Sequence, residues 1–287
     1  MVQLDYVHNL ERGILSMKLS FTTLGCPKWT LQQIVENAAK MGFDGVDFRG
    51  LLEDIDITKR PEFTTDLNKT KQMFADYGLA VSGISISARF AVADPVEKQK
   101  QFEEARRNMK LAAKLDVYII RVFGGSLPES YNAEDIMPII TENLRQIGDE
   151  AEEYGINLAL ETHDDWTDSA VCARLISQVD HPRVRILWDL HHPYRANGEP
   201  PEVTYANLAK YTVGIHVKDS ILDDKGQPVY VLLGEGDVPL KRMLNMLLQG
   251  GYDGYATLEW EKRWHPELPE PEVAFPQYVQ KMREWLT

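Results

Sequence analysis

From residue 17 onward, apolar strand-like runs alternate regularly with amphipathic helix-like stretches. The strand-like runs are almost continuously apolar, as expected for parallel strands that are covered on both faces. Eight strand–helix units in succession predict a parallel (β/α)8 barrel with right-handed crossovers. The eight expected strands are 18–24, 45–49, 79–86, 117–123, 156–161, 184–189, 213–216 and 255–259.

Helix start and stop signals lie between these runs. Thr30 is placed to cap the first helix, which Gly42 ends, and Asp94 followed by Pro95 opens a long charged helix. No change in composition marks a linker, so we predict a single barrel domain over 17–287, preceded by an N-terminal extension, 1–16. The expected helices are 30–41, 64–77, 94–115, 133–154, 168–179, 204–210, 239–249 and 272–286.

Composition excludes several classes of function. The formal net charge of −13 disfavours nucleic acid, whose phosphates attract basic proteins. No apolar stretch approaches the ~20 residues of a membrane helix, so we expect no membrane partner. The first 16 residues lack the basic start and apolar block of a signal peptide, and two cysteines give no disulfide framework. We therefore expect a cytoplasmic protein.

Four residues with metal-binding side chains end the last four expected strands: Glu161, Asp189, His216 and Glu259. Their spacing is about one strand–helix unit each, with an extra segment, 219–233, before the last. The carboxyl ends of parallel barrel strands meet at one mouth, and three carboxylates gathered there need a cation to neutralise them. We predict one divalent ion, with Mn²⁺ expected first and Mg²⁺, Co²⁺ or Zn²⁺ as alternatives.

Seven short motifs are distributed along the chain: 23–27 (TLGCP), 42–50 (GFDGVDFRG), 160–163 (LETH), 188–192 (WDLHH), 215–219 (IHVKD), 234–237 (GEGD) and 251–259 (GYDGYATLE). Together they resemble the sugar-phosphate isomerase/epimerase family of xylose-isomerase-like TIM barrels, over nearly all of 17–285. That family's ligand order of Glu, Asp, His and Glu on strands five to eight falls on the four residues named above. The resemblance is specific for the metal site and weak for the substrate.

The resemblance implies an enzyme that isomerises or epimerises a keto-sugar through a metal-stabilised enediolate. Glu161 and Glu259 would then remove and return the proton beside the carbonyl. The partner is a small-molecule carbohydrate, and a homo-oligomer, dimer or tetramer, stays open. The chain lacks an obvious cluster of arginines and backbone amides for phosphate, which favours a free keto-sugar or a 3-keto-glycoside.

Further residues are predicted to contact the substrate. His163 follows Glu161 by two residues, where it can reach a substrate hydroxyl, with helix capping or a surface position as the alternatives. His192 completes an Asp-x-x-His pattern in which the family's histidine contacts substrate or a metal-bound oxygen. His191 is expected to be structural. Lys218 is placed to neutralise enediolate or phosphate charge, or else to pair with Asp219 or Glu235.

Basic and aromatic side chains complete the predicted site. Arg121 and Arg49 lie on strands four and two near the catalytic face, where they would balance the acidic site, bind a substrate carboxylate or bridge strands. Glu235 lies between two glycines in a loop that either shapes the mouth or forms a plain turn. Trp29 is a candidate for stacking on a sugar ring, with packing against neighbouring loops as the alternative.

Three other functions compete with this interpretation. A lyase, either inosose-dehydratase-like or keto-glycoside-cleaving, would begin with the same enolisation and then expel a leaving group. An AP-endonuclease-type phosphodiesterase needs additional histidines on strands two and three, and the chain has none between His8 and His163. A barrel that binds sugar without turnover is the third alternative, although both acid/base candidates are present.

Overall fold

The structure of the protein is a computed structural model that describes residues 17–128 and 131–286. The described residues form a closed barrel of eight parallel strands in the order β1-β10-β7-β6-β5-β4-β3-β2, which confirms the predicted (β/α)8 TIM barrel. The expected extension 1–16 lies outside the described residues. The strands are β1 (Lys18–Thr22), β2 (Gly45–Phe48), β3 (Ala80–Arg89), β4 (Ile119–Phe123), β5 (Asn157–Glu161), β6 (Val184–Asp189), β7 (Thr212–Val217) and β10 (Tyr255–Leu258).

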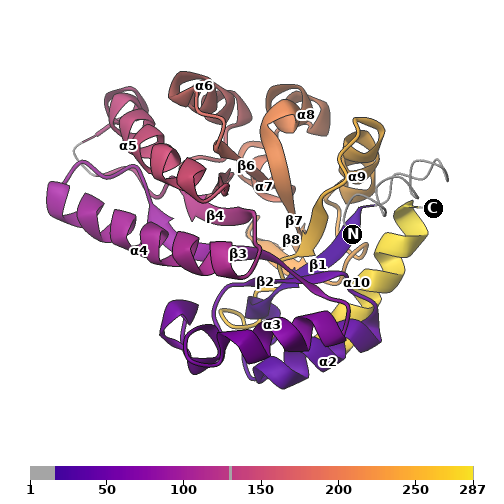
Figure 1. Cartoon of the computed structure of the whole chain (residues 1–287). Coiled ribbons are helices and arrows are strands. Elements are labelled where there is room, and N and C mark those ends of the chain that lie inside the picture. The colour runs from indigo at the N-terminus through magenta and orange to yellow at the C-terminus, as the bar shows by residue number, and fades with distance from the viewer. Residues whose placement is uncertain (1–16, 129–130, 287) are drawn as a thin grey trace.

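Helices surround the strands on all sides (Figure 1). Thr30 forms the expected capping box with Gln33, and Gly42 ends that helix in the left-handed region at φ 85°. Asp94 accepts a hydrogen bond from the Glu97 amide at 2.8 Å and so caps the long charged helix. The helices are α2 (Leu31–Met41), α3 (Leu67–Asp76), α4 (Pro95–Lys114), α5 (Ala133–Glu153), α6 (Ser169–Val179), α7 (His192–Asn197), α8 (Pro201–Leu208), α9 (Leu240–Gln249) and α10 (Pro271–Leu286).

The structure departs from the expected elements mainly in the loops. The first strand ends at Thr22, because Thr23–Gly25 turns into a short 3₁₀ helix (η1). Two further 3₁₀ turns, η2 (Ile57–Lys59) and η3 (Pro61–Phe63), follow β2, and a fourth, η4 (Ala209–Tyr211), follows α8. The unpredicted helix α7 is only six residues long, too short for its periodicity to be read from the sequence.

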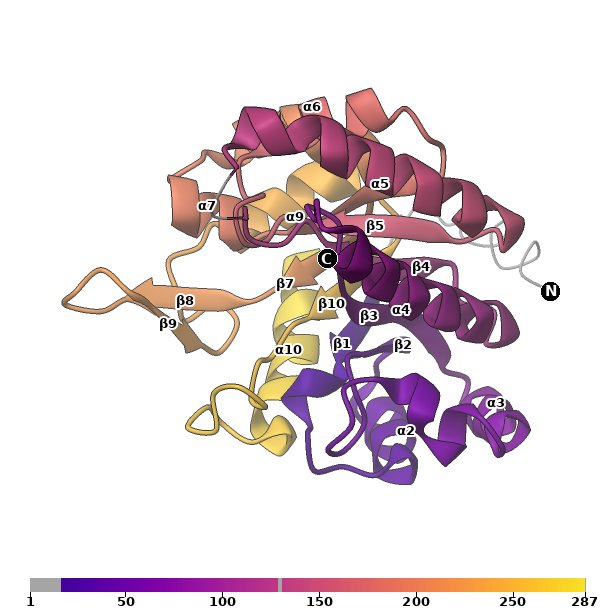
Figure 2. The ribbon, with the colours of Figure 1, turned by 90° about the vertical axis from the view of Figure 1, so that its left-hand side faces the viewer.

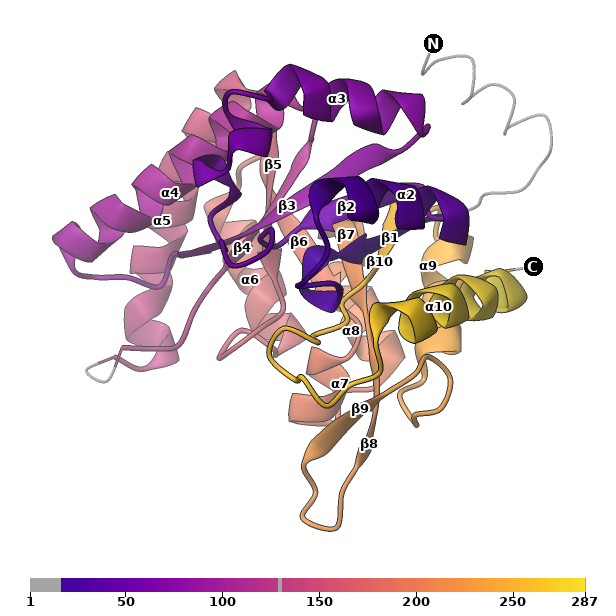
Figure 3. The same ribbon diagram turned by 90° about the horizontal axis from the view of Figure 1, so that it is seen from below.

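The extra segment before the last barrel strand is an antiparallel hairpin, β8 (Asp219–Leu222) and β9 (Pro228–Val231). It projects from the barrel in two views (Figures 2 and 3). At its base, the Asp219 carboxylate accepts hydrogen bonds from the amides of Gly234 and Gly236, at 2.8 and 3.1 Å. The hairpin therefore starts immediately beyond the carboxyl end of β7.

The main apolar core lies between the strands and the helices. On β2, Phe48 packs against Phe63 at 4.9 Å between ring centroids, and Val46 is fully buried. Alternation along a strand then directs Asp47, between them, into the barrel lumen. Among the described residues, no helix has the length and apolarity to cross a membrane.

Candidate metal centre

The four predicted ligand residues meet at the carboxyl end of the barrel. One potential ligand atom from each of them lies within 4.8 Å of the others, and all four residues are buried. His216 Nδ1 is 2.7 Å from Glu161 Oε1 and 3.3 Å from Glu259 Oε1. The strand ends thus bring together side chains that are far apart in the sequence, as the barrel topology requires.

Local hydrogen bonds hold the Asp189 carboxylate at the end of β6. Its Oδ1 accepts hydrogen bonds from the backbone amides of His191 and His192, at 2.8 and 3.1 Å. The Asp189 amide donates in turn to Thr162 Oγ1 at 3.0 Å, which ties β6 to the end of β5. With Oδ1 held in this way, Oδ2 is the oxygen on the side of Lys218.

Two buried cations balance the acidic cluster. Lys218 Nζ lies 2.9 Å from Asp189 Oδ2, 2.5 Å from Glu259 Oε2 and 2.9 Å from Glu261 Oε1. Among the described residues Lys218 pairs with these three acids, and not with Asp219 or Glu235. It therefore lies inside the predicted site.

Arg121 is the second cation, and it approaches from β4. Its Nε lies 3.3 Å from Glu161 Oε2, and its Nη1 donates to the Ile86 carbonyl at 2.9 Å. Its guanidinium group also lies 3.9 Å from the centre of the Phe123 ring. These contacts fix the charge beside one carboxylate of the cluster.

The mutual interactions keep the cluster ionised despite its burial. Burial and the neighbouring Glu259 oppose ionisation of Glu161, but Arg121 and His216 outweigh both and lower its pKa to about 2. Burial also opposes ionisation of Glu259, where Lys218 and His216 hold the pKa well below its usual range. The same carboxylates raise the pKa of His216 well above that of an ordinary histidine, against the effect of burial. The ionised carboxylates thus need a positive charge between them, which the protonated His216 ring supplies here.

The donor set fits a divalent cation. Carboxylate oxygens and an imidazole nitrogen are the ligands that Mn²⁺, Mg²⁺, Co²⁺ and Zn²⁺ take in proteins. Their spacing within 4.8 Å is that of atoms around a single ion. In the structure His216 Nδ1 lies at this point, so a cation would replace its proton.

Two predicted histidines lie beside the cluster. His192 Nδ1 is 2.9 Å from the Thr162 carbonyl and 3.7 Å from Asp189 Oδ2. The ring of His163 lies 4.7 Å from that of His192, and its Nδ1 is 2.9 Å from Asp164 Oδ1. Both side chains retain some exposure, which leaves them accessible to a ligand at the mouth.

The remaining histidine of this segment, His191, has structural contacts. Its Nε2 is 2.8 Å from Ser220 Oγ in the hairpin, and its ring lies 5.6 Å from that of Tyr230. Burial lowers the pKa of His191 to about 3, so the ring is neutral. It joins the Asp189 segment to the base of the hairpin.

Arg49 is close to the cluster, whereas Trp29 is directed elsewhere. The Nη2 of Arg49 donates to Ser87 Oγ at 2.9 Å, and burial together with Arg121 lowers its pKa to about 10. Trp29 is buried, with its Nε1 donating to Glu272 Oε1 at 3.2 Å and its ring 5.7 Å from that of Phe275. These are contacts with α10, so Trp29 has the packing environment considered as the alternative to sugar stacking.

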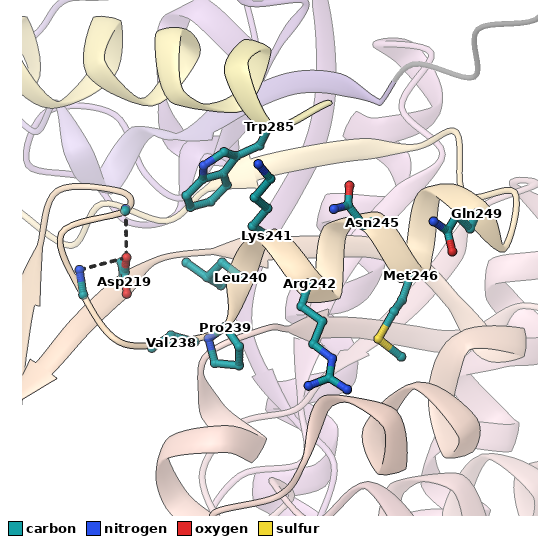
Figure 4. A pocket seen from close by; sticks show the side chains of 12 residues that line it. Asp219, Val238, Pro239, Leu240, Lys241, Arg242, Asn245, Met246, Gln249 and Trp285 are labelled. Carbon is teal, nitrogen blue, oxygen red and sulfur yellow. Dashed lines mark hydrogen bonds between the residues drawn. The ribbon is translucent and has the colours of Figure 1, made fainter. Parts of the chain in front are cut away.

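Glu235 is exposed in the turn between Gly234 and Gly236. This turn borders a cavity of about 650 Å³ on the flank of the barrel, lined largely by α9 and by Trp285 of α10 (Figure 4). Gly234 and Gly236 donate to Asp219 at the base of the hairpin, and the Glu235 amide donates to the Leu232 carbonyl at 3.0 Å. The structure therefore does not bring Glu235 together with the four-residue cluster.

Two acidic residues near the cluster were not predicted. Glu261 is two residues beyond Glu259 and shares Lys218 with it. The signal for Glu261 was this spacing of two, which keeps side chains on one side of an extended chain. Asp47 is a single carboxylate inside the apolar β2 run, which is itself an unusual position for an acid.

Comparison with known proteins agrees with this fold. The sequence model of the xylose isomerase-like TIM barrel family matches residues 35–286, and the chain belongs to that family. This confirms the resemblance carried by the seven motifs.

Three relatives illustrate the family's range. Fructoselysine 3-epimerase of Escherichia coli O157:H7 is 21% identical over 94% of this chain and 98% of its own. Inosose dehydratase of Geobacillus thermodenitrificans is 22% identical over 90% of this chain and 89% of its own. The crystal structure of the IolI protein, solved with a bound zinc atom, has a TM-score of 0.80 at 19% identity, covering 94% of this chain and 98% of that one. The family thus includes sugar epimerases and dehydratases, and a metal-bound example.

Proposed function

We propose that this protein is a divalent-metal-dependent isomerase or epimerase of a keto-sugar or sugar derivative. The buried cluster of Glu161, Asp189, His216 and Glu259 is the observation that carries this proposal. In the structure Arg121, Lys218 and a protonated His216 offset the three buried carboxylates, and a divalent cation at the same point would take over the role of the His216 proton. The epimerases among the relatives supply the substrate class.

The acid and base of the proposed reaction are Glu161 and Glu259. A divalent cation, when bound, polarises the substrate carbonyl and stabilises negative charge on its oxygen. One ionised glutamate would take the proton from the carbon beside the carbonyl, and the other, after taking up a proton from solvent, would deliver that proton to carbon. Return on the opposite face gives an epimer, and return at the neighbouring carbon gives an isomer. The neighbouring cations lower the pKa of both carboxyl groups, which favours the ionised form that the base needs.

In this proposal, other side chains bind and neutralise the substrate. Lys218 contacts Glu259 and Arg121 contacts Glu161, and both cations would offset the negative charge that develops during proton removal. The rings of His163 and His192 lie 4.7 Å apart beside the cluster, and their nitrogens would hydrogen-bond substrate hydroxyls. Mn²⁺ as the resident ion, a free keto-sugar or 3-keto-glycoside as substrate, a dimer or tetramer, and a cytoplasmic location stay predictions.

A metal-dependent lyase is the second candidate. The observation in its favour is the match to inosose dehydratase over 90% of this chain. The first step would be the same proton removal, after which a hydroxyl or glycosidic oxygen leaves from the next carbon. The two candidates differ only in the fate of that bond, so product analysis distinguishes them.

The test combines metal analysis with solvent exchange. We expect about one divalent ion per chain after dialysis, and deuterium from heavy water at the carbon beside the carbonyl of D-tagatose, D-fructose or a 3-keto-D-glucoside. Glu259→Gln should lower the exchange rate by about 10²–10⁴-fold, because it removes one acid/base group while the barrel stays folded.

Glu153→Gln, at an exposed position on α5, is the matched control and should exchange at the wild-type rate. A dehydrated or cleaved product would establish the lyase instead. Protein that binds no ion after Mn²⁺ or Co²⁺ is supplied, or an active Glu259→Gln enzyme, would contradict the proposal.

A further inference from the structure

One nitrogen of the His216 ring is engaged by the cluster, and the other is not. Nδ1 faces the carboxylates of Glu161 and Glu259, whereas Nε2 is buried with no hydrogen-bond partner among the described residues. When Nδ1 binds a cation it carries no proton, and the neutral ring then carries its proton on Nε2. A buried N–H without an acceptor is costly, and metal-binding histidines almost always donate this proton to a carboxylate, a carbonyl or water.

Asp47 offers an acceptor in the same enclosed space. It faces the lumen from β2, is 5% exposed, and its Oδ1 has no hydrogen-bond partner within the described part of the chain. Burial raises the pKa of Asp47, and the charge of His216 is the largest influence that opposes this rise; Ser85 also lies within reach of the carboxylate. The charges of the Asp47 carboxylate and the His216 ring therefore influence each other.

The topology directs both side chains toward the axis of the barrel. In the strand order β2 is separated from β7 by β1 and β10, and side chains that point inward from strands three places apart in an eight-stranded barrel converge near its axis. Thr22, the register partner of Asp47 on β1, is also fully buried and has an unpartnered hydroxyl in the described structure. A buried water typically bridges such a group of polar atoms.

Gly83 shapes the space that Asp47 occupies. It is the register partner of Asp47 on β3, and a Cβ at this position would lie 2.5 Å from Asp47 Oδ2. Any larger residue would displace the carboxylate. The absence of a side chain at Gly83 thus allows Asp47 to lean into the lumen.

We propose that Asp47 positions the metal ligand His216 by accepting the hydrogen bond of its Nε2–H group through one buried water shared with Thr22. The carboxylate would fix the ring in the form that presents Nδ1 to the cation, and would orient it toward Glu161 and Glu259. This inference rests on the proposed metal centre, but not on the reaction that the centre catalyses.

The test measures Mn²⁺ affinity from the electron paramagnetic resonance signal of free Mn²⁺. Asp47→Ala should weaken binding by about 10–100-fold, the usual effect of losing such a partner. Asp47→Asn retains an acceptor oxygen and should recover most of this loss. Gly83→Ala removes no polar group yet should weaken binding in the same direction, because its methyl group displaces Asp47.

Asp44→Ala is the matched control, since Asp44 lies at the amino end of β2, where it accepts the Leu19 amide at 2.7 Å. It should leave Mn²⁺ affinity unchanged. Folded Asp47→Ala protein with wild-type affinity would overturn this inference alone. Wild-type protein without Mn²⁺ binding would overturn the metal centre itself and this inference with it.

A second measurement uses the unmodified protein and does not depend on the folding of a variant. In Zn²⁺-loaded protein labelled with ¹⁵N-histidine, His216 should show the tautomer with its proton on Nε2, and that proton should exchange slowly with solvent. A proton on Nδ1, or rapid exchange at Nε2, would overturn the proposal.

Discussion

The two halves of the barrel place different chemistry at the same mouth. Strands β5, β6, β7 and β10 carry the four candidate ligands at or next to their carboxyl ends. Strands β1 to β4 contribute hydroxyl groups, the carboxylate of Asp47 and the guanidinium groups of Arg49 and Arg121. The half formed by β5, β6, β7 and β10 (the ligand half) therefore gathers negative charge around one point. The half formed by β1 to β4 supplies groups that balance this charge and orient the ligands.

The balance of charge can be counted at the centre itself. Among the described side chains, the four acids Glu161, Asp189, Glu259 and Glu261 contact two fixed cations, Lys218 and Arg121. A divalent ion with a neutral histidine would bring the group to zero. The charge count of the two halves therefore supports the proposed divalent cation.

The largest expected effect comes from removing a cation within the ligand half. Lys218→Met should destabilise the metal-free protein by about 3–5 kcal/mol, because it leaves Asp189 and Glu259 buried without their partner. Added Mn²⁺ should recover part of this loss by neutralising the same carboxylates. Urea unfolding in EDTA and in Mn²⁺ measures both quantities.

Glu261→Gln serves as the comparison for this variant. Glu261 is the more exposed of the acids that contact Lys218, and its loss leaves Lys218 with two buried carboxylate partners. We expect a change below about 1 kcal/mol. If Lys218→Met is as stable as the wild type in EDTA, the buried carboxylates do not need Lys218 for their stability. The proposed balance of four acids and two fixed cations would then be wrong.

A smaller effect is expected in the other half, at Arg121. Arg121→Lys keeps the positive charge but loses the fork geometry that contacts Glu161 and the Ile86 carbonyl together, and the stacking on Phe123. We expect a loss of about 2 kcal/mol in unfolding free energy, the value of a hydrogen bond to a charged group. An unchanged unfolding midpoint would mean that charge alone, without geometry, is needed on this side.

The ligand residues were predictable because barrel topology converts strand ends into neighbours. Glu161 and Asp189 end apolar runs, and parallel strands around a closed barrel leave their carboxyl ends only one place to meet. Lys218 was predicted as a site residue for the same reason, two residues beyond His216. For these positions the knowledge of secondary structure was almost sufficient.

Other features depend on how loops pack, which periodicity does not encode. Trp29 is directed toward α10 because Phe275 and Glu272 accommodate its ring and its N–H, and no local pattern identifies these distant partners. The 219–233 segment was seen as an insertion but not as a hairpin. Asp47 escaped prediction because its role depends on facing His216 from three strands away.

The smallest expected effect on stability is at Arg49, and here stability and activity should separate. Arg49 is less buried than Arg121, and its Nη2 contacts Ser87 Oγ. Arg49→Lys should therefore change the free energy of unfolding by less than about 1 kcal/mol.

If the half of the barrel that includes β2 binds substrate, the same variant should raise KM at least severalfold with little change in kcat, because it weakens ground-state and transition-state binding alike. Ser87→Ala, which removes only the hydroxyl partner, should leave KM close to the wild-type value. Equal KM values for Arg49→Lys and the wild type would assign Arg49 to bridging β2 and β3, and would restrict the recognition role of this half to the side chains nearer the cluster.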